Sequence, residues 1–207
     1  MRKALVGCGA LAGPLFAVTF SIAGARRRGY DPRRHPVSAL ALGPGGVVQR
    51  ANFIATGALY LAGAAGLRKT DTSNIAAAPM PALIAGAGAG LIGAALFDTD
   101  PVSGYPPGTP AQLAEPSHTG AVHNLCAIPV FVGISAAALM SARPAAKADA
   151  KGWAAYSAAS GALMAASSIA AGAGFGQQPA LVASAGLLQR VSIVAGFGWV
   201  TALCLRA

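Results

Sequence analysis

The chain has 207 residues, of which 55% are hydrophobic and only 10% are charged, and its mean hydropathy is +0.57. About 25% of the residues in a typical soluble domain are charged, so this composition argues against a water-soluble globule, and the abundance of apolar residues excludes a disordered chain. The net charge of +9 does not indicate a nucleic-acid partner, because the basic residues flank apolar segments instead of alternating with aromatic residues.

Six apolar segments follow one another along the chain. An α-helix needs about 20 apolar residues to cross the hydrocarbon core of a bilayer. The expected spans cover residues 4–25, 47–67, 75–97, 119–142, 152–175 and 180–205. They predict an all-α, polytopic transmembrane bundle of six helices, formed as a single integral membrane domain over residues 1–207, with both termini on one side of the membrane.

The expected spans are rich in alanine and glycine. Three pairs of glycines have the small-xxx-small spacing: Gly9 and Gly13, Gly86 and Gly90, and Gly172 and Gly176. This spacing lets helix backbones approach closely in lipid, either within one chain or between copies of it. We expect tight packing within the bundle, with a homo-oligomer through the same faces as the alternative.

The N-terminal segment resembles a secretory signal peptide, because Arg2 and Lys3 precede an apolar run and the small residues 23–25 follow it. We expect an uncleaved anchor, since the run is long enough to span and three arginines come directly after it. Basic residues on the side of the termini outnumber those on the opposite side by eight to six. This excess favours a multi-pass protein of the cell membrane with cytoplasmic termini.

Two long polar connections have opposite charge. Residues 26–50 carry all six basic residues of their side, whereas residues 98–118 carry three acidic residues and neither Lys nor Arg. The number of spans places both connections on one membrane face. Because opposite charges attract more strongly beside a low-dielectric wall, we expect the two connections to associate as a polar cap. The prolines and aspartates of residues 98–110 predict a rigid turn-rich loop.

A charged residue inside a predicted span marks a candidate site. Arg190 lies roughly 15 Å into the sixth span, where a charge costs at least about 2.5 kcal/mol. We expect Asp98 or Glu115 to pair with it, either in a ligand site or in a purely structural ion pair. The candidate ligand-binding residues toward this face are Arg33, His35, Arg50, Asn52, Asp98, Asp100, Tyr105, His118, His123, Asn124, Gln189 and Arg190. No nucleophile and base pair identifies catalytic residues.

The histidines do not define a cofactor. Haem between helices requires histidines at matched depth on two spans, and only His123 lies well inside one. A zinc site could combine His118 and His123 with Asp98 or Asp100, but five residues of spacing place the two histidines about 140° apart on a helix. We therefore predict no metal and no cofactor.

Two further groups of residues have ordinary structural interpretations. Trp153, Tyr156 and Trp199 fall near the ends of spans and are expected to be interfacial anchors. The three cysteines, at positions 8, 126 and 204, have no paired spacing and are expected to be small buried apolar residues.

The polar segments of the chain resemble a known family. They are Gly29–Ser38, Gly43–Phe53, Asp98–Pro110, His118–Asn124, Gly172–Gly176 and Leu188–Arg190. Together they resemble the prokaryotic six-span membrane family catalogued as domain of unknown function 998, over essentially the whole chain. The resemblance implies an integral membrane fold and supplies no activity, substrate or catalytic residue.

Three functional hypotheses remain open. The first is an integral membrane protein that contacts membrane lipid and binds a small polar or anionic ligand, a lipid headgroup or a partner at its polar face. The second is a membrane-embedded enzyme acting on a lipid or isoprenoid, with His123, Asp98 and Asp100 as acid, base or metal ligands. The third is a small transporter, which the lack of a visible three-plus-three repeat disfavours.

Overall fold

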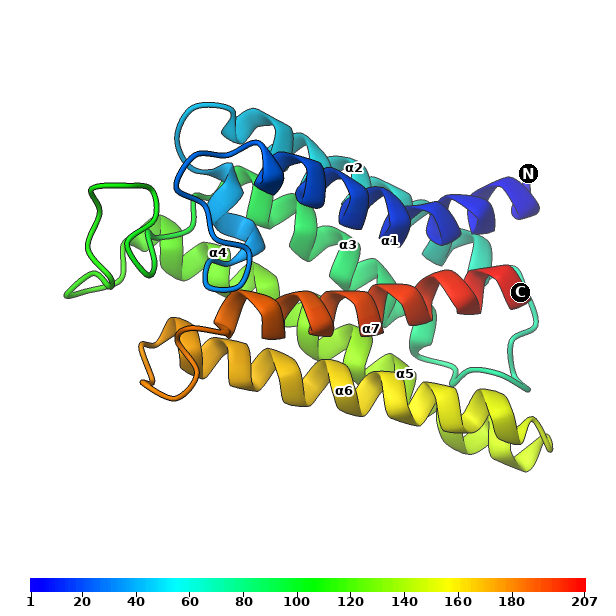
Figure 1. Cartoon of the computed structure of the whole chain (residues 1–207). Helices are drawn as coiled ribbons and strands as arrows, with labels where there is room; N and C mark the ends of the chain where they lie inside the picture. Colours follow the sequence, from blue (N-terminus) through cyan, green and yellow to red (C-terminus); the bar gives the residue numbers. More distant parts are fainter.

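The computed structural model describes residues 1–207 as a bundle of helices with roughly aligned axes (Figure 1). The elements are α1 (Arg2–Ala25), the short 3₁₀ helix η1 (Val37–Ala41), α2 (Gly46–Leu67), α3 (Met80–Leu96), α4 (His118–Ile128), the π-helical turn η2 (Pro129–Gly133), α5 (Ile134–Lys147), α6 (Lys151–Phe175) and α7 (Ala185–Arg206). There is no β-sheet, which confirms the predicted all-α class.

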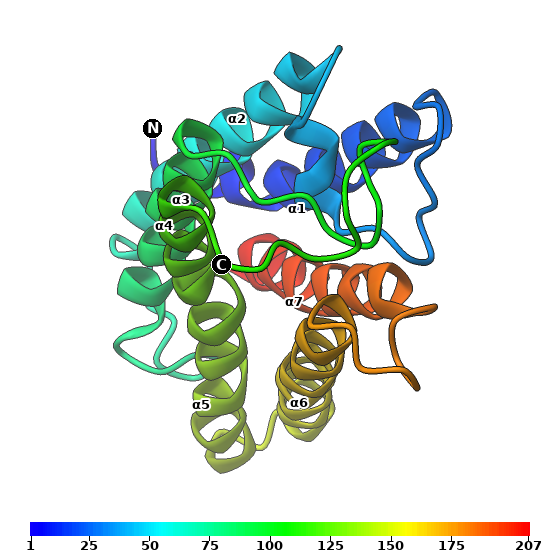
Figure 2. The ribbon, with the colours of Figure 1, turned by 90° about the vertical axis from the view of Figure 1, so that its left-hand side faces the viewer.

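The helices form a closed ring in chain order. α1 packs on α2, α2 on α3, α3 on α4, α5 on α6 and α6 on α7, and α7 returns to α1 (Figure 2). α4, η2 and α5 join end to end into one rod of 30 residues. Six rods therefore surround the interior. Successive connections lie at opposite ends of the bundle, so rods that follow one another in the chain run antiparallel (Figure 1).

The predicted span boundaries agree with the helices except at two starts and at the end of the fourth span, where α5 continues past residue 142 to Lys147. The third helix begins at Met80 instead of residue 75, because Pro79 and Pro81 place prolines at its first turn and the preceding residues form turns. The sixth rod begins at Ala185 instead of residue 180, because the chain turns through Gln177 at a φ of 64° and continues in turns before α7. These two later starts lengthen the connections that precede α3 and α7.

Four helical stretches are long and apolar enough to cross a membrane: Arg2–Ala25, His118–Lys147, Lys151–Phe175 and Ala185–Arg206. The apolar helix α3 has only 17 residues. α2 is long enough, but its first two turns contain Gln49, Arg50 and Asn52, and it is not among the four. The composition and length of the four stretches are those of a multi-pass membrane protein.

The two ends of the bundle differ. Both termini lie at one end, which we call the terminal end (Figure 1). The connections 26–45, 97–117 and 176–184 lie at the other, which we call the loop end. The ring centroids of Tyr30 and Tyr105 are 5.2 Å apart, so the basic and acidic connections do meet as predicted.

Glycine contacts hold several rods together at short distance. A Cβ added at Gly9 would lie 3.1 Å from the Cα of Gly63, and one added at Gly90 would lie 2.9 Å from the Pro129 side chain. Both positions therefore pack within the chain. A Cβ at Gly172 would meet nothing within 4 Å, so this glycine does not pack against another helix.

The tryptophans are core residues, and the expectation that they are interfacial anchors is wrong. Trp199 is fully buried and donates from Nε1 to the Ser157 hydroxyl over 2.9 Å. Trp153 stacks on it, with ring centroids 6.2 Å apart, and donates to the Ile75 carbonyl. Their N–H groups find partners inside the bundle, which removes the need for an interfacial position. Tyr156 is partly exposed beside them.

Candidate functional site

A cavity of about 460 Å³ opens at the loop end of the ring. It lies between the α4–η2 rod on one side and α6 and α7 on the other, with residues of α1, α2 and α3 behind it. The connections around residues 36–38, 99–102 and 112–116 cover it. We call it the loop-end cavity.

The walls of the loop-end cavity are mostly apolar. Five of the seven phenylalanines in the chain line it: Phe16, Phe53, Phe131, Phe175 and Phe197. The phenylalanines are therefore concentrated around one space, whereas Trp153 and Trp199 are buried elsewhere in the bundle. Such a wall accommodates hydrocarbon.

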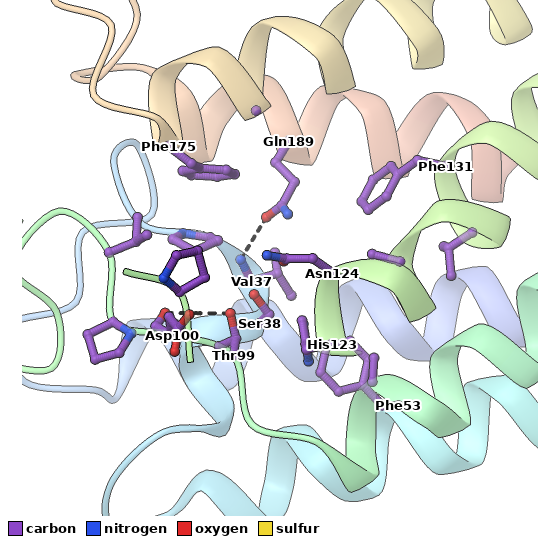
Figure 3. Close-up of a pocket in the computed structure, with 18 of the residues that line it drawn as sticks. Val37, Ser38, Phe53, Thr99, Asp100, His123, Asn124, Phe131, Phe175 and Gln189 are labelled. Atoms are coloured by element: carbon purple, nitrogen blue, oxygen red, sulfur yellow. Dashed lines mark hydrogen bonds between the residues drawn. The ribbon is translucent and has the colours of Figure 1, made fainter. Parts of the chain in front are cut away.

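Polar side chains also line the cavity. His123, Asn124 and Gln189 point into it from α4 and α7, and Ser38 and Thr99 reach it from the covering loops (Figure 3). No Lys or Arg lines it, and Asp100 is the single acidic residue that does. The cavity therefore combines apolar walls with hydrogen-bonding groups.

His123 presents an unpaired ring nitrogen. Its Nδ1 lies 2.9 Å from the Phe97 carbonyl oxygen. A carbonyl oxygen only accepts, so Nδ1 carries the proton and Nε2 of the neutral ring is an acceptor. Nε2 has no hydrogen-bond partner within the protein. Phe53 packs edge-on against the ring and helps to fix its orientation.

Gln189 and Asn124 add amide groups to the same space. Gln189 accepts through Oε1 from the Val37 backbone N–H over 2.7 Å, which leaves its amide N–H₂ free (Figure 3). The side-chain amide of Asn124 makes no hydrogen bond within the protein, although Asn124 lines the cavity. Together with His123 they offer a ligand both donors and acceptors.

Asp100 anchors the covering loop to α4. Its carboxylate accepts from the backbone N–H and the hydroxyl of Ser117, and Ser117 in turn caps α4 by accepting from the Gly120 N–H over 3.0 Å. A carboxylate at a helix N-terminus is stabilised by the partial positive charge there. The loop is thus held over the cavity by an acid whose hydrogen-bonding capacity is largely used.

The α4 side of the cavity faces the outside of the bundle. α4 packs along α3 but makes no extensive contact with α6 or α7. Asn124 is exposed while lining the cavity, and so are Gly172 on the facing helix α6 and Gly176 directly after that helix. The cavity is therefore open between α4 and α6 as well as being covered by loops.

The expected ion pair of Arg190 with Asp98 or Glu115 is wrong. Its guanidinium donates to the carbonyls of Pro32, His35 and Gly186 and to the hydroxyl of Tyr30. The guanidinium also lies 5.5 Å from the ring centre of Phe20. Arg190 is therefore compensated by oxygen dipoles and aromatic faces, and it clamps the basic connection onto α7.

His35 and Tyr105 belong to this clamp and not to the cavity. Their rings lie 5.1 Å apart, with Tyr30 beside both. His35 accepts at Nδ1 from the Asp31 N–H and donates from Nε2 to the Ser103 carbonyl. Burial lowers the pKa of His35, and burial raises the pKa of Tyr30 despite the opposing effect of Arg190. Both groups stay neutral at pH 7.

Asp98 pairs with Arg50 in the structure. The two residues lie on adjacent antiparallel helices, Arg50 near the start of α2 and Asp98 just after the end of α3, so they meet without crossing the bundle. This is the one ion pair between the expected basic and acidic segments. Elsewhere the two connections meet through aromatic rings and carbonyls: Arg27 donates to the Leu42 and Leu40 carbonyls and to the Tyr105 hydroxyl.

The remaining predicted site residues lie apart. Asn52 is buried within the bundle and donates to the Phe16 carbonyl. Arg33 and His118 are exposed. No three His, Cys, Asp or Glu side chains come together in metal-binding geometry, so His118, His123 and Asp98 or Asp100 do not form the zinc site considered from the sequence.

Of the twelve predicted residues, Asp100, His123, Asn124 and Gln189 line the loop-end cavity. Sequence reasoning missed its phenylalanine wall and the hydroxyls of Ser38 and Thr99. The signal available in the sequence was that phenylalanine is scarce. In helices rich in alanine and glycine, a large ring leaves space around it that other large rings can fill, so the few phenylalanines are expected to gather around one space.

The fold and composition are those of an all-helical, multi-pass membrane protein with an amphipathic cavity at one end. Residues 10–206 match the family model described as Protein of unknown function (DUF998), and the chain belongs to this family, as its polar segments had indicated. No curated protein and no solved structure is significantly similar to the chain.

Proposed function

We propose that this protein crosses the membrane with six rods and binds an amphiphilic molecule in the loop-end cavity, with an uncharged polar head at His123, Asn124 and Gln189 and an apolar body against the phenylalanine wall. The observation that carries the proposal is that one cavity is lined both by five phenylalanines and by side chains with unpaired donors and acceptors. The volume of about 460 Å³ falls within the roughly 300–1,000 Å³ typical of ligand sites.

The charge of the cavity supports an uncharged head. An anionic headgroup needs cations, but the arginines expected to supply them are engaged elsewhere: Arg190 in the clamp with Tyr30 and Arg50 with Asp98. Desolvating an unpaired anion in such a site is costly. A hydroxyl or amide head satisfies the His123 Nε2 acceptor and the Gln189 amide donors without a charge.

The opening between α4 and α6 supports entry of this molecule from the lipid. A molecule with a long apolar body partitions into the bilayer, and the exposed α6 edge at Gly172 leaves room beside the cavity mouth. The π-helical turn η2 contributes Val130 and Phe131 to the wall, and π-turns occur frequently at functional sites. Such a turn adapts a straight helix to the shape of a bound molecule.

The test uses a variant that fills the cavity without disturbing helix packing. Gly172→Leu places a side chain where a Cβ meets nothing within 4 Å, so the fold is retained while the cavity is occluded. We expect the wild-type protein, purified in mild detergent, to retain a neutral amphiphile that is identified by mass spectrometry of extracted lipid. The variant should retain at least about tenfold less, which corresponds to about 1.4 kcal/mol of lost binding.

Gly152→Leu is the matched control, since this glycine lies on the same helix at the terminal end and is equally unobstructed. Its retained amphiphile should equal that of the wild type. If all three proteins retain the same molecules in the same amounts, the loop-end cavity is not the binding site. If the wild type retains no neutral amphiphile above the bulk lipid composition, the proposed function is wrong.

A further inference from the structure

A second hollow, separate from the loop-end cavity, lies on the outer face of the bundle between the end of α1 and the start of α2. It is lined by Arg26, Arg27 and Arg28, by residues of the Leu42–Gly45 turn, and by Tyr105, Pro106 and Pro107. Its volume is about 740 Å³. We call it the arginine groove.

The groove has three cations and no acid. No Asp or Glu is among its lining residues, and neither ion pair of the structure involves its arginines. Arg26 and Arg28 are exposed, and their guanidinium groups make no hydrogen bond to the protein. Arg27 lies beside Gly45, where the N-terminus of α2 adds further positive potential. The groove therefore repels cations and is complementary to an anion with several acceptor oxygens.

The floor of the groove is apolar and continues along the bundle surface. Ile22, Ala23 and Val48 line it, and Ile22 and Val48 are both exposed. One turn further down α1, Val18 is also exposed. α1 is one of the four helices long and apolar enough to span a membrane, so its C-terminal end with the three arginines falls at the level of lipid headgroups.

We infer that the arginine groove binds the phosphate of an anionic phospholipid, with Arg26 and Arg28 as direct phosphate ligands and with an acyl chain along Val18, Ile22 and Val48. Charge complementarity selects the head, and the exposed apolar track beside it selects a lipid over a free anion. Arg27 holds the walls of the groove together and is not a direct phosphate ligand, because its guanidinium already donates to the Leu40 and Leu42 carbonyls.

The experiment is native mass spectrometry of the full chain in detergent, titrated with phosphatidylglycerol or with phosphatidylcholine. The wild type should retain phosphatidylglycerol in preference to phosphatidylcholine. The double variant Arg26→Gln/Arg28→Gln should lower phosphatidylglycerol retention about tenfold. Arg33→Gln/Arg34→Gln is the matched control, because it removes the same charge from exposed residues of the same connection that do not line the groove. Its retention should equal that of the wild type.

Equal loss in the two double variants would show a diffuse charge effect and overturn the inference, as would unchanged retention in Arg26→Gln/Arg28→Gln. Inorganic phosphate is added in a third arm. If millimolar phosphate displaces phosphatidylglycerol completely, the groove is a free-anion site and the lipid assignment is wrong. The result is independent of the loop-end cavity, since Gly172→Leu should leave phosphatidylglycerol retention unchanged.

Discussion

At the scale of single residues, Arg190 shows how a charge is stabilised inside a helical membrane protein without a counter-ion. Four oxygen atoms accept its hydrogen bonds and two aromatic rings face its guanidinium. The planar guanidinium has five N–H donors, which suits several separate acceptors better than the compact ammonium of lysine. The carbonyls of Pro32 and His35 belong to the basic connection, so one side chain ties that connection to α7.

The role of Arg190 predicts that Arg190→Leu destabilises the protein. Removing the guanidinium takes a donor away from the Tyr30 hydroxyl and from three carbonyls. A hydrogen bond to a charged group contributes about 1.5–3 kcal/mol. We expect a loss of about 2–3 kcal/mol, measured as a lower midpoint of thermal unfolding in detergent, with Arg190→Lys intermediate. Arg33→Leu, at an exposed position of the same connection, should melt like the wild type. If Arg190→Leu also melts at the wild-type temperature, the contacts of Arg190 with the basic connection do not stabilise the fold.

The limits of prediction are also clearest at individual residues. The location of Arg190 toward the loop end followed from its place in an apolar segment, but its partners did not. Carbonyl acceptors are present at every residue and carry no sequence signal, whereas a carboxylate is conspicuous and suggests a pairing that geometry does not allow. Asp98 illustrates this, because the nearest cation lies on the antiparallel neighbour of its own helix.

At the scale of helices, the spacing of glycines decides which rods approach closely. Gly9 on α1 and Gly63 on α2 face each other, so their backbones come into contact with no side chain between them. The glycine spacing alone predicts close helix packing somewhere in the bundle. The structure shows which helix each glycine packs against. Gly172 has the same spacing motif but no helix against it, and this exception lies at the loop-end cavity.

The contact of Gly9 predicts a position-specific effect of valine on α1. In Gly9→Val, the new Cβ would lie 2.7 Å from the Cys204 sulfur and 3.1 Å from the Gly63 Cα, so α1 must move away from both neighbours. Overpacking of this kind costs about 1–3 kcal/mol. In Gly7→Val on the same helix, the Cβ meets nothing within 4 Å. The first variant should unfold at a lower temperature in detergent and the second should not. Equal midpoints would mean that helix propensity, and not the α1–α2 contact, controls the effect.

At the scale of the whole molecule, the apolar segments predicted all six rods, with three boundaries wrong by five residues, while the cavity could not be predicted. Helix existence depends on local composition and on the turn residues between segments, both of which are visible in the chain. The cavity depends on where α4 stands relative to α6 and α7, and that is set by contacts among residues far apart in sequence. Its phenylalanines come from α1, α2, η2, α6 and α7.

The ring also predicts that α2 and α3 cross the membrane, although neither is among the four stretches that qualify by length and hydropathy. α2 rises about 33 Å and α3 about 26 Å, against a hydrocarbon core of about 30 Å. α1 and the α4–α5 rod flank them as full-length spans. Antiparallel packing in the ring then carries the connection after α2 back to the terminal end.

Single cysteines, labelled with a membrane-impermeant maleimide in intact cells, measure this crossing. The three native cysteines are replaced by alanine, and reporters are placed at the exposed residues Asn74, Glu115 and Asp149. With cytoplasmic termini, Glu115→Cys should react from outside, while Asn74→Cys and Asp149→Cys should react only after the membrane is opened. The reverse pattern would preserve six crossings with the opposite orientation. Reaction of Asn74→Cys together with Glu115→Cys from the same side would place α2 and α3 outside the bilayer and refute the six-rod membrane ring.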